Sequence, residues 1–295
     1  MSNQYQLQEL SVTFGYFVNN CNPDTVTAPG VMGLISKARN YLAAIDGRKN
    51  EADVVKTRVR FRNAAETLLK RTDWIGASAQ QSLRDFINEQ PEFLSEGAYK
   101  FTYDFFSANI EQWQKNLGRF AGLPNLAFLE VGSFEGKSAC WVLQNILTHE
   151  TSNLTCIDVF FEEKHEGVYD TTGLDSALMS REDRFEHNIR QTNARHRVEK
   201  IVGLSQKVLR TLPLSFYDFI YIDGSHIARG VLEDAVLAWQ LLKQGGIITF
   251  DDYLWQDHPD PLLCPRMAID GFLSVYEGHY QLVHKAYQVT LEKLS

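Results

Sequence analysis

From Pro124 onward, short apolar runs alternate with segments whose apolar residues recur at helical spacing. The strand-like runs are 126–132, 154–160, 198–203, 216–223 and 245–253, and the helical patterns between them are 137–147, 181–193, 205–212 and 231–242. Strands that alternate with helices form crossover units, which build a parallel sheet with helices on both faces. The near-continuous apolar character of the runs is typical of strands buried on both sides. We therefore expect an α/β fold.

The segment after Pro265 extends this pattern in a different way. A helical pattern at 266–278 is followed by two strand-like runs, 280–287 and 288–294, with almost nothing between them. Strands joined so closely form an antiparallel pair. We expect this pair at the edge of the sheet, which gives seven strands, mostly parallel, with the last one antiparallel.

Residues before about 120 show no strong strand pattern. Helical spacing predicts helices over 27–45, 54–71, 78–90 and 99–120, and the last of these is rich in aromatic residues. Basic and aromatic residues on such helices are explained by a solvated face and a packing face, and a lid or a dimer contact is the alternative. We expect residues 1–98 to form a helical N-terminal extension, for a lid or for dimerisation, and residues 99–295 to form the sheet domain.

Composition narrows the class of protein. The chain has 295 residues, 44% of them apolar and 22% charged, which is the profile of a soluble globular protein. Its net charge of −8 argues against nucleic acid or an anionic membrane as the main partner, because both need clustered Lys and Arg. No apolar run approaches the roughly 20 residues of a membrane helix, and the first residues do not resemble a signal peptide. Four scattered cysteines indicate reduced thiols, so we expect a cytoplasmic protein without a zinc site or a disulfide framework.

Ligands of open parallel sheets bind at the carboxyl ends of the strands. The first strand ends in EVGSFEGKSA, which holds Glu130, Gly132, Ser133, Gly136 and Ser138. Glycines let the backbone approach a ligand closely, and the helix that follows offers free N–H groups. The spacing is G-x-x-x-G and not the dinucleotide fingerprint G-x-G-x-x-G. A tight strand-to-helix turn also needs such a loop, so the loop alone leaves both readings open.

The second strand ends in Asp158, one strand further along the chain. A carboxylate at this place can accept hydrogen bonds from the two hydroxyls of a ribose. A helix cap or a surface acid is the alternative for Asp158 alone. The glycine loop one strand earlier favours the nucleoside reading.

Three more carboxylates lie at the ends of the fourth and fifth strands, at Asp223, Asp251 and Asp252. Neighbouring carboxylates raise each other's pKa unless a cation neutralises them. Oxygen ligands favour Mg²⁺, Mn²⁺ or Ca²⁺ over zinc. The alternative is that Asp251 or Asp252 caps its loop through backbone hydrogen bonds.

His226 lies three residues after Asp223. A neutral imidazole beside a cation can take a proton from a substrate hydroxyl, because its pKa lies near working pH. A structural histidine that bonds to a loop carbonyl is an equal alternative.

The order LEVGSFEGKSACWVL, TCIDVF, FIYIDGSH and LLKQGGIITFDDY resembles the class I S-adenosylmethionine-dependent methyltransferases. It most resembles the bacterial small-molecule O-methyltransferases that carry YIDGSH and DDY signatures, relatives of the macrocin and catechol types. The resemblance covers roughly residues 99–295 and implies a Rossmann-like methyltransferase sheet. The helical region before it resembles no family that we can name.

The resemblance also implies roles for individual residues. Glu130, Gly132, Ser133, Gly136 and Ser138 would hold the methionine part of S-adenosylmethionine, Asp158 would bind the ribose, and Ser205 would lie near the adenine. Asp223, which would also border the cofactor, would hold Mg²⁺ or another divalent cation with Asp251 and Asp252. His226 stands where the catechol type has a lysine base, so the resemblance leaves the identity of the base open.

The expected activity is divalent-metal-assisted O-methylation of a hydroxyl on a small molecule, with Asp223 and His226 as catalytic residues. The expected partner is a hydroxylated acceptor, and the chain is expected to form a homodimer or a higher homo-oligomer. Two other functions fit the same residues. One is a metal-dependent hydroxylase on the same fold, and the other is a non-catalytic cofactor-binding module.

Overall fold

The computed structural model describes residues 28–46, 51–71, 76–94, 97–160, 179–256 and 260–294. The chain divides into two compact units, Met1–Asp104 with Thr171–Asp183 and Phe105–Asp170 with Arg184–Ser295. Within the described part of the chain, no helix is long and apolar enough to cross a membrane.

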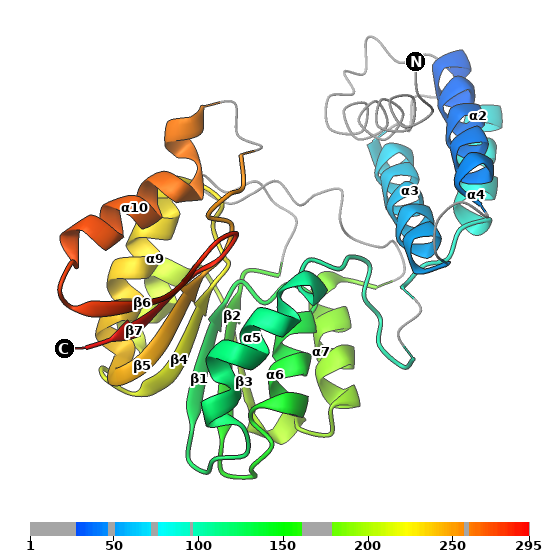
Figure 1. Ribbon diagram of the computed structural model, residues 1–295. Helices are drawn as coiled ribbons and strands as arrows, with labels where there is room; N and C mark the ends of the chain where they lie inside the picture. The colour runs from blue at the N-terminus through cyan, green and yellow to red at the C-terminus, as the bar shows by residue number, and fades with distance from the viewer. Residues whose placement is uncertain are drawn as a thin grey trace. The chain divides into compact units, whose positions relative to one another are not determined.

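Among the described residues of the first unit, three helices share a core: α2 (Ala28–Ile45), α3 (Glu51–Arg71) and α4 (Ala77–Asn88) (Figure 1). They share a core to which α2 contributes Ile35, α3 contributes Phe61, and α4 contributes Leu83 and Phe86. These apolar residues recur at helical spacing in the sequence, so packing one stripe of each helix against the others buries them. The three helices predicted over 27–45, 54–71 and 78–90 are confirmed.

The single helix predicted over 99–120 is wrong. Residues 99–106 are not helical, and the helical part begins with a 3₁₀ turn, η1 (Ser107–Asn109), continues as α5 (Ile110–Leu117) and ends in η2 (Gly118–Phe120). The sequence YKFTYDFF at 99–106 holds aromatic and β-branched residues, which lose side-chain freedom in a helix. Phe101 and Phe106 are buried, and the backbone N–H of Leu94 donates to the Phe101 carbonyl at 2.8 Å, so tertiary contacts hold this segment in a non-helical form.

Seven strands form one sheet in the order β3-β2-β1-β4-β5-β7-β6. Their bounds are β1 Ala127–Val131, β2 Asn153–Asp158, β3 Val198–Val202, β4 Tyr217–Ile222, β5 Leu242–Phe250, β6 Tyr280–Lys285 and β7 Val289–Lys293. Strands β1 to β5 are parallel, and β7 pairs antiparallel with both β5 and β6. The predicted fold, a Rossmann-like, mostly parallel seven-stranded sheet with an antiparallel last strand, is confirmed.

Helices cover both faces of this sheet (Figure 1). They are α6 Lys137–Asn145, α7 Arg181–Gln191, α8 Ser205–Val208, α9 Ala228–Leu241 and α10 Pro265–Val275, with 3₁₀ turns η3 Arg195–Arg197, η4 Leu209–Thr211 and η5 Pro261–Leu263. On one face, Trp113 of α5 packs edge-on against Phe219 and Tyr221 of β4. On the other, Ile220 and Ile222 belong to a core shared with α9 and α10. Both faces of β4 are thus buried, which explains its continuous apolar sequence.

The strand order reverses at β1, which pairs with β2 on one side and β4 on the other. Crossovers run away from this point in opposite directions, so the loops after β1 and β4 diverge and leave room at the carboxyl edge. The site described next lies there.

Candidate active site

A cavity of about 230 Å³ opens at the carboxyl ends of the central strands. It is lined by the last residues of β1 and β2, by the segments that follow β1, β2, β3 and β4, and by the first turns of α9. These residues are Val131, Gly132, Ile157, Asp158, Val159, Gly203, Leu204, Ser205, Gln206, Gly224, Ser225, Arg229, Gly230 and Glu233. We call it the strand-end cavity. It includes three of the residues that the sequence assigned to a cofactor, namely Gly132, Asp158 and Ser205.

Gly132 marks the closest approach of two loops in this cavity. Its φ is +87°, and a Cβ atom added to it would lie 2.0 Å from the carbonyl oxygen of Asp223. No other residue type fits there, because a side chain would be strained by the backbone conformation and would collide with the loop after β4. The missing side chain is therefore what brings the end of β1 against the backbone of Asp223.

Asp158 braces two of the loops that line the cavity. One carboxylate oxygen accepts a hydrogen bond from the backbone N–H of Phe134 and the other from that of Phe160, each at 2.8 Å. Phe134 has a φ of +48°, which is strained for an aromatic residue. The carboxylate thus fixes the loop after β1 to the loop after β2, and each oxygen keeps a second lone pair for a ligand.

The remaining residues predicted to hold the methionine part lie behind the cavity lining. Glu130 is 3% exposed and accepts hydrogen bonds from the Ser138 hydroxyl and, at 3.7 Å, from the Cys156 thiol. Burial raises the pKa of Glu130 to about 7, against the effect of the hydrogen bond from Ser138. Gly136, at φ +77°, is the N-cap of α6. These residues are not part of the cavity lining and support the loop after β1. Their predicted contact with a cofactor stays a prediction.

Helix α7 also contacts the glycine loop, the segment 130–138 that follows and includes the end of β1. The Arg184 guanidinium donates to the Glu135 carboxylate at 2.7 Å, and the two side chains are 0% and 1% exposed. Asn188 donates to the Glu135 carbonyl at 2.9 Å. A Cβ on Gly136 would come within 2.9 Å of the Phe185 ring. Helix α7 therefore packs directly on the loop and fixes its shape.

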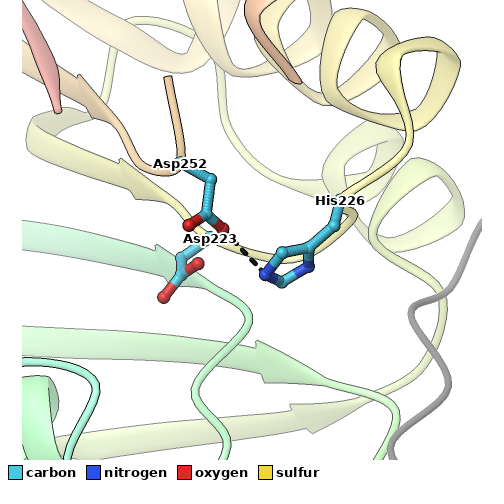
Figure 2. A group of neighbouring side chains, drawn as sticks. All are labelled: Asp223, His226 and Asp252. Atoms are coloured by element: carbon cyan, nitrogen blue, oxygen red, sulfur yellow. Dashed lines mark ion pairs between the residues drawn. The ribbon is translucent and has the colours of Figure 1, made fainter. Parts of the chain in front are cut away.

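Asp223, His226 and Asp252 meet beside the cavity (Figure 2), and we call them the carboxylate–histidine cluster. One ligand atom from each lies within 4.8 Å of the other two. The His226 Nε2 atom is 2.7 Å from Asp252 Oδ2. The loops after β4 and β5, which are neighbouring parallel strands, carry all three side chains to one edge. Two carboxylates and an imidazole nitrogen are a donor set that fits a divalent cation.

Asp251, the third predicted metal ligand, is placed differently. Its Oδ2 atom accepts hydrogen bonds from the Tyr221 hydroxyl and, at 3.0 Å, from Gln288 Nε2. Its Oδ1 atom accepts from the backbone N–H of Asp252 at 2.7 Å. The Tyr221 hydroxyl is also 3.1 Å from Asp223 Oδ2, so one phenol proton lies between two carboxylates. Asp251 borders the cluster through Tyr221, and its role as a ligand stays a prediction.

Burial and crowding set the charges of this region. The pKa of Asp223 lies well above its ordinary value because of burial and then because of the charges of Asp251 and Asp252. Burial, with the charge of Asp252, also raises the pKa of Asp251 to about 6. For His226, burial lowers the pKa, but the hydrogen bond and charge of Asp252 outweigh it, so the pKa is raised. Three carboxyl groups thus crowd around one imidazole, and a bound cation would favour their ionised forms.

Several residues around the site were missed by the sequence analysis. Helix α9 begins at Ala228 and not at 231, so its first turns bring Arg229, Gly230 and Glu233 to the strand-end cavity. The only available signal was their place directly after the carboxyl end of a strand. Trp255, whose ring is 5.4 Å from the His226 ring, gave no signal at all.

Comparisons with known proteins bear on this region. Residues 129–253 match the model of a family described as "Methyltransferase domain". An uncharacterized protein, R132, of Acanthamoeba polyphaga mimivirus is 27% identical over 168 residues, which cover 56% of this chain and 66% of the relative. The matched part is thus just under two thirds of that relative's length.

Two solved structures are similar at low sequence identity. The O-methyltransferase from Bacillus cereus in complex with SAH is 17% identical, with a TM-score of 0.46, over 64% of this chain and 83% of that one. The O-methyltransferase TomG from Streptomyces achromogenes, in complex with SAM, is 17% identical, with a TM-score of 0.45, over 73% of this chain and 87% of that one. Such likenesses carry no information about the substrate of this chain.

The matched stretch contains every residue that lines the strand-end cavity and all three members of the carboxylate–histidine cluster. Residues 129–253 are thus similar to a methyltransferase domain.

Proposed function

We propose that the protein is an S-adenosylmethionine-dependent methyltransferase that methylates a hydroxyl group of a small molecule with the help of a divalent cation. The observation that carries the proposal is the contact between the two halves of the site. Gly132 lines the strand-end cavity and also packs against the backbone of Asp223. A methyl donor in the cavity would therefore lie next to the carboxylate–histidine cluster, where an acceptor hydroxyl would be held.

The strand-end cavity has the features that S-adenosylmethionine requires. Glycines at 132, 203, 224 and 230 open its wall to close approach by the backbone, and Asp158 offers carboxylate lone pairs to a ribose. Ser205 and Gln206, after β3, offer polar groups on the side where the adenine would lie. S-adenosylmethionine supplies the reactive methyl group, so the protein's own contribution is largely to position the two reactants.

The carboxylate–histidine cluster would hold the acceptor. Asp223 and Asp252 are the carboxylates that would bind a divalent cation, and a bound cation supplies positive charge that lowers the pKa of a hydroxyl. His226 would act as the base for that hydroxyl, and its Nε2 atom lies 2.7 Å from Asp252 Oδ2. Asp252 orients the imidazole and stabilises it once it is protonated. In the transfer, a lone pair of the acceptor oxygen would form the new bond to the methyl carbon. The electron pair of the broken sulfur–methyl bond would stay on sulfur, which leaves as a neutral thioether.

The first test is calorimetric titration of the chelator-treated protein with S-adenosylmethionine, alone and then with Mg²⁺ or Mn²⁺. We expect binding in the micromolar range and a separate heat from the cation. No binding of S-adenosylmethionine under either condition would refute the proposal.

The second test follows a labelled methyl group from S-adenosylmethionine into a panel of hydroxylated acceptors. Asp223→Ala should abolish transfer and leave S-adenosylmethionine affinity nearly unchanged. His226→Ala should lower kcat most at low pH, because hydroxide replaces the missing base as the pH rises. A His226→Ala enzyme whose pH–rate profile equals that of the unmodified enzyme would return His226 to a structural role.

One observation favours a second function. The imidazole of His226 lies among carboxylates, and such a mixed nitrogen and oxygen set also suits iron. A metal-dependent hydroxylase would contain iron as purified and would transfer no labelled methyl group. Metal analysis of the purified protein, read together with the labelling assay, separates the two activities.

A further inference from the structure

The turn between β6 and β7 packs directly on the two consecutive carboxylates that follow β5. The Tyr287 hydroxyl donates to Asp252 Oδ1 at 2.8 Å, and the Tyr287 carbonyl accepts from the backbone N–H of Tyr253 at 2.9 Å. The next residue, Gln288, donates to Asp251 Oδ2 at 3.0 Å. Two adjacent residues of this turn thus hold two adjacent carboxylates, although 35 positions separate Tyr287 from Asp252.

Asp252 needs such support because of its backbone. Its φ is +59°, in the left-handed region, which costs a residue other than glycine roughly 1–2 kcal/mol. This conformation turns the Asp252 side chain toward Asp223 and His226 (Figure 2). A strained conformation persists only where surrounding contacts fix it. The two bonds from Tyr287, one from its side chain and one through its backbone, are contacts of that kind.

The two oxygens of Asp252 have separate partners. Oδ1 accepts from Tyr287, and Oδ2 faces His226 at 2.7 Å. A phenol hydroxyl 2.8 Å from a carboxylate oxygen acts as the donor of that hydrogen bond. Tyr287 therefore fixes the rotation of the carboxylate while Oδ2 stays directed into the cluster.

The turn is itself anchored in the core. Gln288 is 3% exposed, and its Oε1 atom accepts a hydrogen bond from Trp113 Nε1 at 2.8 Å. Val289 begins β7 and pairs with Phe250, the last residue of β5. Phe250, just before the two carboxylates, and Val289, just after the turn, are thus joined through the sheet. This pairing gives Tyr287 little freedom to move away from Asp252.

We propose that Tyr287 is a positioning residue that aims the Asp252 carboxylate for cation binding. This inference rests on the proposed function, because the cation belongs to it. A group that hydrogen-bonds to a metal ligand and orients it typically contributes to metal binding, and its removal lowers metal affinity by about 10-fold to 100-fold. Tyr287 would act on the cation through Asp252 and would not touch S-adenosylmethionine.

The test is the Mn²⁺ affinity of the full chain, measured by electron paramagnetic resonance of free Mn²⁺, with S-adenosylmethionine affinity measured in parallel by calorimetry. Tyr287→Phe should weaken Mn²⁺ binding at least 10-fold, the lower end of the range for removing a hydrogen-bond partner of a metal ligand. Its affinity for S-adenosylmethionine should stay within about 2-fold of that of the unmodified protein, because Tyr287 acts only on Asp252. The matched control is Tyr280→Phe, which removes a hydroxyl from the same hairpin where it donates to the Leu273 carbonyl at 3.3 Å. This control should bind Mn²⁺ as the unmodified protein does.

A double-mutant cycle with Asp252→Asn shows whether Tyr287 acts through Asp252. Once the carboxylate is gone, Tyr287→Phe should have no further effect on Mn²⁺ affinity. Equal Mn²⁺ affinity in Tyr287→Phe and the unmodified protein would overturn the inference and leave the proposed function standing. If the unmodified protein bound S-adenosylmethionine but no Mn²⁺, the metal-assisted mechanism would fall and the inference with it.

Discussion

Replacing Gly132 with alanine tests how closely β1 and β4 must approach to build the site. The added Cβ would lie 2.0 Å from the Asp223 carbonyl oxygen and 2.7 Å from Gly224 Cα, both of them backbone atoms. Backbone cannot rotate away as a flexible side chain can, so the loops must separate. The left-handed φ of +87° adds about 1–2 kcal/mol of strain, and overpacking adds about 1–3 kcal/mol. We expect a loss of about 2–5 kcal/mol in the free energy of unfolding.

Gly245→Ala is the matched control. Gly245 has a similar φ of +74°, but a Cβ added there meets nothing within 4 Å, so only the strain of about 1–2 kcal/mol applies. Urea unfolding followed by tryptophan fluorescence measures both variants, and calorimetry measures their affinity for S-adenosylmethionine. Gly132→Ala should lose more stability than Gly245→Ala and should lose cofactor binding, which the control retains. Equal losses in the two variants would refute the close approach of the two loops.

Three further substitutions test other parts of the sheet domain. Arg184→Met removes the guanidinium that pairs with the buried Glu135 carboxylate and should cost about 3–5 kcal/mol in urea unfolding. A double variant with Glu135→Gln should recover part of that loss, and no recovery would contradict the pairing. Asp234 is 0% exposed, and burial raises its pKa to about 7. The folded state therefore keeps a proton that the unfolded state releases from about pH 4 upward, so the free energy of unfolding falls as the pH rises to 7. Asp234→Asn should therefore stabilise the protein by up to about 4 kcal/mol at pH 8 and hardly at all at pH 4, and an effect independent of pH would contradict this. Asp158→Ala removes the acceptor of two backbone N–H groups, and each unsatisfied group costs roughly 1–3 kcal/mol. We expect S-adenosylmethionine binding, measured by calorimetry, to weaken at least 10-fold in Asp158→Ala and by a smaller factor in Asp158→Asn.

Much of the sheet domain could be predicted from the sequence because its strands are buried on both faces. The run FYDFIYID predicts a strand over 216–223, and β4 covers Tyr217–Ile222 with every residue except Asp218 buried. The same reasoning fails at 99–106, where aromatic residues at helical spacing are held by tertiary contacts and not by a helix. Periodicity identifies a buried face, but it does not say which backbone conformation presents that face.

The site could be predicted only in part. Asp158 ends a strand, and Asp223 and Asp252 follow strands. Parallel strands bring their carboxyl ends to one edge, so the positions in the sequence place these residues at the same edge of the sheet. The distinction between Asp251 and Asp252 depends on the φ of Asp252, which no pattern in the sequence encodes. Tyr287 reaches Asp252 because β7 lies beside β5, a long-range pairing that the sequence predicts only as an edge hairpin.

The position of β7 has a consequence for the order in which the protein folds. Strand β7 is made after β6 yet lies inside it, and β6 pairs only with β7 within the described sheet. During synthesis β6 therefore has no partner until the segment that follows it has left the ribosome, so the two strands must join the sheet together as a hairpin. Because that hairpin carries Tyr287 and Gln288, the carboxylates at the end of β5 receive their outer hydrogen bonds only in this late step. A nascent chain that has already closed β1 to β5 would hold the strand-end cavity before it holds the finished carboxylate–histidine cluster.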